Sequence, residues 1–500
     1  MSLFLVILPF VVFIWFLLKA KMSLLKVSLL TLAIVTFSVI FYWQILPQLL
    51  LLSYVKGFFI ALDIFFIIFG AIFFLSILQN RGIIANLSKY LESFSKDYRV
   101  QVIILAWFFE NFLEGTAGFG MGSAVVAALL IGLGLKPLRA VIIALIANSA
   151  AGVFGAAGTP IKIGLAGLNT AGVPLIASLI NCFAFIVPIF LLWALVSDKI
   201  DRKRQFFEAL PFAIISGLAF VIPSVFCVFL GQEFPTILGS VIGLLLIYLC
   251  ARFNILLPKN IRAFDQENTV VVPELSKTDK IKTILPYLIL IVLLIAGKFI
   301  LSPLVWNISL LAGGSHTLAL FNPGFIFVIT GLLVMLIFII KREVLFSCAK
   351  LSLIRAIEPF LVILAMSAMV QLMINSGNNY SGFASAIAIL AKSFENVFLP
   401  AIAPFVIAFG SFITGSVTIS NIMFGNFLSY AATAMNMSAA KILALGVVGG
   451  ATGNMMALAD ILSTEAAAGM KNRERELLRA VVLPCLFCLA VIALIGMLII

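Results

Sequence analysis

Two carboxylates, Glu110 and Glu114, lie in a stretch that is otherwise apolar and rich in glycine. The stretch covers residues 110–160 and reads ENFLEGTAGFGMGSAVVAALLIGLGLKPLRAVIIALIANSAAGVFGAAGTP. An ionisable side chain at bilayer depth costs several kcal/mol and usually marks the path of a substrate or an ion. Because burial favours the neutral form of a carboxyl group, Glu114 could take up and release a proton. Glu110, four residues earlier on the same helical face, could share that proton.

Each carboxylate also has a structural interpretation. Glu114 directly precedes Gly115, so its side chain could accept hydrogen bonds from the backbone amides that follow and hold a helix break in shape. Glu110 could simply face a cavity. The two roles of Glu114 are compatible, and both depend on a break in the helix at this point.

Glycine recurs in two clusters of this stretch, GTAGFGMG at 115–122 and GVFGAAG at 152–158. Backbone groups released from a helix at membrane depth must face protein or a water-filled cavity. Their N–H groups could bind an anion. The alternative is that the glycines let helices pack closely in lipid.

Amide and hydroxyl pairs occur once in each half of the chain, as Asn148-Ser149 and Ser420-Asn421. Their oxygens could ligate Na⁺ or hydrogen-bond a substrate, or they could serve as helix caps and contacts between helices. Two cations follow the glycine clusters, Arg139 and Lys162. Either could meet a carboxylate substrate or extend to the membrane interface, and Lys162 is better placed because it directly follows the second cluster.

Composition places these residues in a membrane protein. Of 500 residues, 63% are hydrophobic and 10% are charged, against about 25% charged in average globular chains. The net charge of +12 comes from basic residues in short runs between apolar segments, a pattern typical of cytoplasmic loops and not of nucleic-acid binding. The six cysteines and the single His316 predict no metal site, and no P-loop for ATP is present.

Apolar runs of about 20 residues recur along the chain and predict about twelve to fourteen membrane segments. The first, at residues 3–18, has no basic residue before it and three lysines after it, so we expect a retained helix with its N-terminus outside the cell. Residues 252–283 are polar and are expected to form a cytoplasmic linker between two halves.

The two halves share an order of features. FLEGT at 112–116 is echoed by FITGS at 412–416, and each is followed by an apolar helix and a second interrupted stretch, at 148–160 and 449–460. Corresponding interrupted segments favour a transporter site built from repeats. We expect one domain in which repeat 1 covers about 57–200 and repeat 2 about 357–500, and loop charges favour inverted orientation.

Residues 97–161 resemble the L-lactate permease family of bacterial carriers, whose pattern is approximately DRRVQ…FLEGAAGFGTPVA…GLGF.PL.A…IANS…FGA.GTPI. GSFITGSVTISNIMF at 410–424 is similar to the family's GAFITGS.T.SN..F, and GGATGNM at 449–455 and RERELLR at 473–479 also match. The resemblance covers nearly the whole chain. It implies proton-coupled uptake of lactate, and often glycolate, across the bacterial inner membrane, with Glu114 as the family's FLEG carboxylate. The chain departs from the family where Met121-Gly122-Ser123 replaces Thr-Pro-Val.

The combined expectation is an all-α polytopic membrane protein with two inverted repeats that contain broken helices or re-entrant hairpins. It would be a secondary transporter for a small hydroxymonocarboxylate, not an enzyme, with H⁺ as coupling ion and no cofactor. A sodium-coupled carrier and, from another class, a membrane-embedded enzyme remain as alternatives. Glu114 and Glu110 are the proton-coupling candidates. The substrate-binding candidates are Gly115, Thr116, Gly118, Gly120, Asn148, Ser149, Lys162, Arg139, Ser416, Thr418, Ser420 and Asn421.

Overall fold

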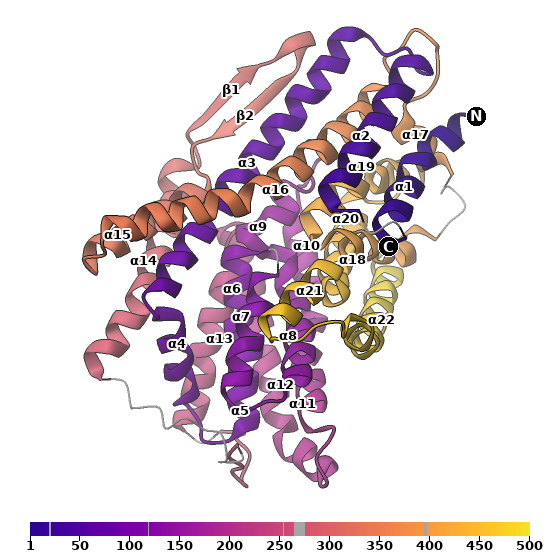
Figure 1. Ribbon diagram of the computed structural model, residues 1–500. Coiled ribbons are helices and arrows are strands. Elements are labelled where there is room, and N and C mark those ends of the chain that lie inside the picture. The colour runs from indigo at the N-terminus through magenta and orange to yellow at the C-terminus, as the bar shows by residue number, and fades with distance from the viewer. Residues whose placement is uncertain (20–21, 119, 254, 265–275, 394–397) are drawn as a thin grey trace.

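The computed structural model describes residues 1–19, 22–118, 120–253, 255–264, 276–393 and 398–500 (Figure 1). Nearly all of its regular structure is helical, which confirms the predicted all-α polytopic class. In this described part, ten helices are long and apolar enough to span a bilayer, and four shorter apolar helices accompany them. Phe119 and part of the expected linker, residues 254 and 265–275, lie outside the described residues.

The first half of the chain contains α1 (Ser2–Leu18), α2 (Leu24–Phe41), α3 (Pro47–Asn80), α4 (Ile83–Glu92), α5 (Tyr98–Ile103), α6 (Glu110–Ala117), α7 (Met121–Gly132), α8 (Pro137–Ala151), α9 (Gly155–Lys162), α10 (Val173–Ile180), α11 (Val187–Val196), α12 (Arg202–Cys227) and α13 (Pro235–Arg252). The second half contains α14 (Lys277–Leu301), β1 (Val305–Ser309), β2 (Ser315–Ala319), α15 (Pro323–Ile337), α16 (Arg342–Asn375), α17 (Ala386–Lys392), α18 (Leu399–Thr414), α19 (Val417–Ala434), α20 (Ala439–Gly453), α21 (Leu458–Ala467) and α22 (Glu474–Ile499).

The longest helices, α3 and α16, have 34 residues each and pack along one another across the molecule (Figure 1). The strands β1 and β2 form an antiparallel hairpin beside α3, in which Val305 pairs with Ala319 and Ser309 with Ser315. The expected all-α fold included no such hairpin. Its pairing is local and its side chains are largely exposed, so the sequence lacks the alternation of buried apolar residues that predicts a strand.

A continuous helical stretch leads to the first carboxylates. It begins at α5, passes through a π-helical segment at Ile104–Phe109 and continues as α6. Arg99 anchors its start, because the buried guanidinium bonds Asp97 at 2.7 Å and Glu208 at 3.2 Å. Single π-type segments inside α-helices frequently occur at functional sites. This one ends where Glu110 begins α6.

The first helix break lies between α6 and α7. Gly118 has φ 68° and ψ −167°, and Gly120 has φ 68° in the left-handed region. The second break follows α8, where a 3₁₀ turn at Gly152–Phe154 leads into left-handed backbone at Ala156, Ala157 and Gly158. Left-handed alanines cost about 1–3 kcal/mol each and persist only where the surroundings hold them.

The second half is interrupted at the corresponding points. Gly415 is left-handed between α18 and α19, and Ser416 caps α19 by accepting a hydrogen bond from the Ile419 amide. After α20, a 3₁₀ turn at Asn454–Met456 and extended Ala457 precede α21. The same order of helix, break, two helices and break thus occurs twice in the described chain.

The breaks are shorter than the sequence suggested. Asn148 and Ser149 were expected inside an interrupted stretch, but they lie in α8, before the 3₁₀ turn. Thr418, Ser420 and Asn421 belong to the first turns of α19, because capping by Ser416 restarts the helix immediately. Likewise, residues 449–453 complete α20.

Candidate functional site

Three buried carboxylates, which we call the acidic cluster, lie where the first break meets the second half of the chain. Glu110 and Glu114 lie on α6 and Asp460 lies on α21, and none exposes more than 2% of its surface. Glu114 accepts hydrogen bonds from the backbone amides of Gly120 and Gly122, so it holds the break between α6 and α7 as its structural interpretation predicts. Its Oε2 atom, and both carboxyl oxygens of Glu110, have no partner among the described residues.

Asp460 joins the cluster from about 350 residues further along the chain, and two contacts hold it in place. Asn148 Nδ2 donates to Asp460 Oδ2 at 3.2 Å. A Cβ at Gly120 would strike the Asp460 carboxylate, so glycine is required there both for its left-handed backbone and for this close approach. The two halves of the chain are therefore locked together at the acidic cluster.

Glycine at position 122 is needed for the same cluster. A Cβ built there would lie 3.0 Å from Glu110 Oε1 and 3.1 Å from the Glu110 carbonyl oxygen. Gly122 thus leaves room for the Glu110 carboxylate beside Glu114.

A small cavity lies between the broken segments of the two halves, and we call it the central cavity. Its volume is about 20 Å³, enough for a single water molecule. The walls come from both halves: Glu114, Gly118, Gly152, Gly155, Ala156, Thr159, Pro160, Gly415, Ser416, Val417, Thr418 and Asn454. In this conformation the central cavity has room for no more than about one water molecule.

Two pairs of hydroxyl groups connect the two halves of the chain. Thr159 of α9 lies 3.2 Å from Thr418 of α19, oxygen to oxygen. Ser123 of α7 lies 3.1 Å from Thr464 of α21. The helices α9 and α21 follow the second break of their half, and α7 and α19 follow the first break. Each hydroxyl pair therefore joins one helix of each kind, and the two helices come from different halves.

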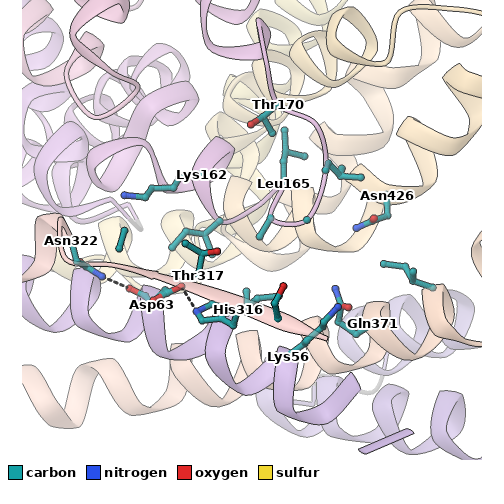
Figure 2. A pocket seen from close by; sticks show the side chains of 18 of the residues that line it. Lys56, Asp63, Lys162, Leu165, Thr170, His316, Thr317, Asn322, Gln371 and Asn426 are labelled. Carbon is teal, nitrogen blue, oxygen red and sulfur yellow. Dashed lines mark hydrogen bonds and ion pairs between the residues drawn. The ribbon is translucent and has the colours of Figure 1, made fainter. Parts of the chain in front are cut away.

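A wider cavity of about 660 Å³ lies beyond α9, and we call it the vestibule. Figure 2 shows Lys162 and Asn426 on one of its sides and Asp63, His316, Lys56 and Gln371 on the other. His316 of β2 lies 3.4 Å from Asp63 of α3 and stacks on Phe59. Most of the polar groups that line the vestibule were not predicted from the sequence.

Lys162 lies at the end of α9, between the central cavity and the vestibule. Its Nζ is 3.5 Å from Glu233, which also pairs with Lys298 of α14 at 3.1 Å. Both ammonium groups lie over the ring of Phe321. Glu233 and Lys298 were missed in the sequence, where the available signal was a charge next to or inside an apolar segment.

The remaining predicted residues divide by location. Glu114, Gly118, Ser416 and Thr418 line the central cavity, and Glu110, Gly120 and Asn148 lie behind its wall. Gly115 packs against Thr236. The hydroxyl groups of Thr116 and Ser420 donate to the carbonyls of Phe112 and Ile407, and the Asn421 amide donates to the Pro160 carbonyl. Ser149 Oγ is buried without a partner in the described part of the chain.

Arg139 does not reach either cavity. Its guanidinium pairs with Asp198 and donates to the Leu195 carbonyl at 3.1 Å, at the turn after α11. Partial burial alone would raise the pKa of Asp198, but the hydrogen bond and the charge of Arg139 lower that pKa below its usual value. The structure places Arg139 in an ion pair beside the end of α11.

Comparison with known proteins gives a consistent result over the whole length. The family model described as L-lactate permease matches residues 2–310 and 299–500. A putative L-lactate permease of Haemophilus influenzae is 28% identical over 84% of this chain and 83% of its own length. An L-lactate permease of Streptococcus iniae is 28% identical over 75% of this chain and 79% of its own. The glycolate permease GlcA of Escherichia coli is 27% identical over 86% and 83%.

Proposed function

Because this chain belongs to the L-lactate permease family, we propose that it is a secondary carrier for a small hydroxymonocarboxylate, L-lactate or glycolate, taken up together with a proton. The observation that carries the proposal is the central cavity, which is walled by broken helices of both halves and contains a carboxylate. Secondary carriers bind substrate and coupling ion at such discontinuous helices near the bilayer midplane.

The acidic cluster supports proton coupling. Glu110 has no hydrogen-bond donor among the described residues for either carboxyl oxygen. A buried carboxylate without donor or cation is strongly disfavoured, so protonation is the direct way to neutralise it. Glu114 is the proton-linked group of the proposal because it alone of the three lines the central cavity. Asp460 and Glu110 would receive or supply the proton behind it.

Coupling to Na⁺ is the second candidate. Asn148 Oδ1, Ser149 Oγ and Asn454 Oδ1 are buried oxygens without hydrogen-bond partners in the described chain, and such oxygens suit a hard cation.

The two larger cavities support alternating access. The vestibule lies on one side of the central cavity. A second pocket of about 460 Å³ is lined by Leu113 of α6 and Met121 of α7, on the two sides of the first break, and by Gln79 and Arg355. We propose that the halves, as inverted repeats over 57–200 and 357–500, rock about the central cavity and open it to each side in turn. Loop charges would place the vestibule outside the bacterial inner membrane, together with the N-terminus.

Reconstituted protein tests this function. Proteoliposomes loaded with buffer should accumulate labelled L-lactate or glycolate when an inward pH gradient is imposed, and a sodium gradient alone should not drive accumulation. Substrate exchange without any gradient should proceed as well. Accumulation that requires Na⁺ would replace the proton proposal with the sodium one, and transport of neither compound would remove the substrate assignment.

A further inference from the structure

A group of four side chains closes the vestibule on the side of α9, and we call it the lysine cluster. It consists of Lys162, Glu233, Lys298 and Phe321. Glu233 is only 1% exposed, whereas the two lysine side chains are 29% and 24% exposed. Lys162 and Phe321 line the vestibule, and Glu233 lies behind them. One buried carboxylate therefore faces two partly exposed lysine side chains, and of these two Lys162 lines the vestibule.

The contacts within the lysine cluster are unequal. Lys298 Nζ donates to both carboxyl oxygens of Glu233, at 3.1 and 3.2 Å. Lys162 Nζ approaches only to 3.5 Å. One ammonium group is enough to balance one carboxylate, and Lys298 already fills that role. The excess positive charge and the spare donors of an ammonium group belong to Lys162, which faces the vestibule.

The backbone around Glu233 is shaped for this ion pair. Gly231 has φ +136°, and a Cβ there would lie 2.5 Å from Glu233 Oε2 and 3.1 Å from Lys298 Nζ, so no other residue fits. A Cβ at Gly158, in the left-handed turn of the second break, would meet the Gln232 carbonyl oxygen at 2.5 Å. The connection that carries Glu233 is thus packed directly against the broken segment before Lys162.

We propose that the Glu233 carboxylate pairs with Lys162 in the substrate-free carrier and that the substrate carboxylate takes its place there. Glu233 then stays paired with Lys298. This inference rests on the proposed function and adds two specificity-determining residues, Glu233 and Lys298. One exchangeable cation selects a substrate with one carboxylate. Substrate binding would therefore break the ionic contact between Lys162 of α9 and the connection that carries Glu233. Because α9 also lines the central cavity, this change would link binding in the vestibule to the central cavity.

The sign of the change in KM distinguishes this role from simple structural support. In Glu233→Gln the neutral amide competes weakly for Lys162, so the KM for external L-lactate or glycolate should fall about fivefold, the size expected for one partly exposed ion pair. The kcat should fall too, because the substrate leaves Lys162 more slowly. In Lys298→Gln, Glu233 has only Lys162 to pair with, and KM should rise by a similar factor.

The matched control is Glu476→Gln, which removes an exposed ion pair with Arg473 far from both cavities and should leave KM unchanged. If the lysine cluster were only structural, both cluster variants would raise KM or lose transport together. A rise in KM for Glu233→Gln, or equal KM values for all three variants, would overturn the inference.

A binding measurement separates this inference from the proposed function. The thermal stability of purified wild type and Glu233→Gln is followed while L-lactate, glycolate, acetate or pyruvate is added. The variant should be stabilised at about fivefold lower concentration of at least one of these anions. If the wild type transports neither lactate nor glycolate, the proposed function fails, but this shift still decides the inference. No shift by any of the four anions, or identical shifts in both proteins, would overturn it.

Discussion

Asn148 of α8 donates a hydrogen bond of 3.2 Å from Nδ2 to Oδ2 of Asp460 on α21. The same Asp460 carboxylate closely approaches the left-handed Gly120. The contact therefore ties α8, the first break and the second half of the chain to one buried acidic group. Asp460 is thus the connection between the two halves at the acidic cluster.

Removal of this donor should impair transport more than it impairs folding. We expect Asn148→Ala to slow pH-gradient-driven uptake markedly and to lower the free energy of unfolding by about 1–3 kcal/mol, because Asp460 is left buried with no side-chain donor. Asn181→Ala is the matched control, since Asn181 is buried and donates at the same 3.2 Å to the Ala150 carbonyl. Thermal unfolding and initial uptake rates of both variants check this; equal loss of uptake in the control would contradict it.

The approach of Gly120 to Asp460 gives a steric prediction. Gly120→Ala adds a methyl group against the carboxylate and forces alanine into a left-handed conformation, which alone costs about 1–2 kcal/mol. Uptake should be nearly abolished. Gly132→Ala is the control, because a Cβ there meets no atom within 4 Å. Uptake and expression are compared in the same cells, and normal uptake by Gly120→Ala would show that the acidic cluster does not need this fit.

The hydroxyl pair Thr159–Thr418 should couple the halves energetically. Hydrogen bonds between helices in membranes average about 0.6 kcal/mol in double-mutant cycles. A cycle of Thr159→Val, Thr418→Val and the double variant should give a coupling of that size in unfolding experiments. The second pair, Ser123–Thr464, should give the same when treated alike with Ser123→Ala and Thr464→Val. Full additivity in both cycles would mean that the pairs do not hold the halves together.

Arg139 should contribute to the stability of the fold and not to substrate binding. Because the pKa of Asp198 is lowered in the folded protein, the ion pair contributes stability above the unfolded pKa of about 3.9. This contribution is lost as the pH falls through the lower, folded pKa. Asp198→Asn should therefore be less stable than wild type at neutral pH, with a difference that shrinks in acid. Arg139→Gln should keep the KM of the wild type. A large rise in the KM of this variant would mean that Arg139 contributes to substrate binding.

The sequence predicted the membrane class and the positions of the interruptions because glycine and carboxylates inside apolar segments have few other uses. Glu114, Gly118, Ser416 and Thr418 are found together at the central cavity, as the shared order of features in the two halves implies. The length of each break did not follow from composition. Asn148 and Asn421 remain helical because the backbone deviates only where a left-handed residue or a cap turns it.

The vestibule could not be read from the chain in the same way. Glu233, Lys298 and Phe321 come from three segments whose approach depends on tertiary packing, and each is unremarkable in its own segment. The same holds for the His316–Asp63 contact, which requires the β1–β2 hairpin to fold against α3. The sequence shows single charged residues near apolar segments, but their spacing does not indicate which of them form ion pairs.

The central claim is that Glu114, held at the first break by the Gly120 and Gly122 amides, carries the coupled proton at a cavity shared by both halves. The direct test compares wild type and Glu114→Gln in proteoliposomes, with correct insertion verified for both. Accumulation of labelled lactate or glycolate under an inward pH gradient should disappear in the variant, while exchange of substrate across the membrane without a gradient continues. Full pH-driven accumulation by Glu114→Gln would contradict the account.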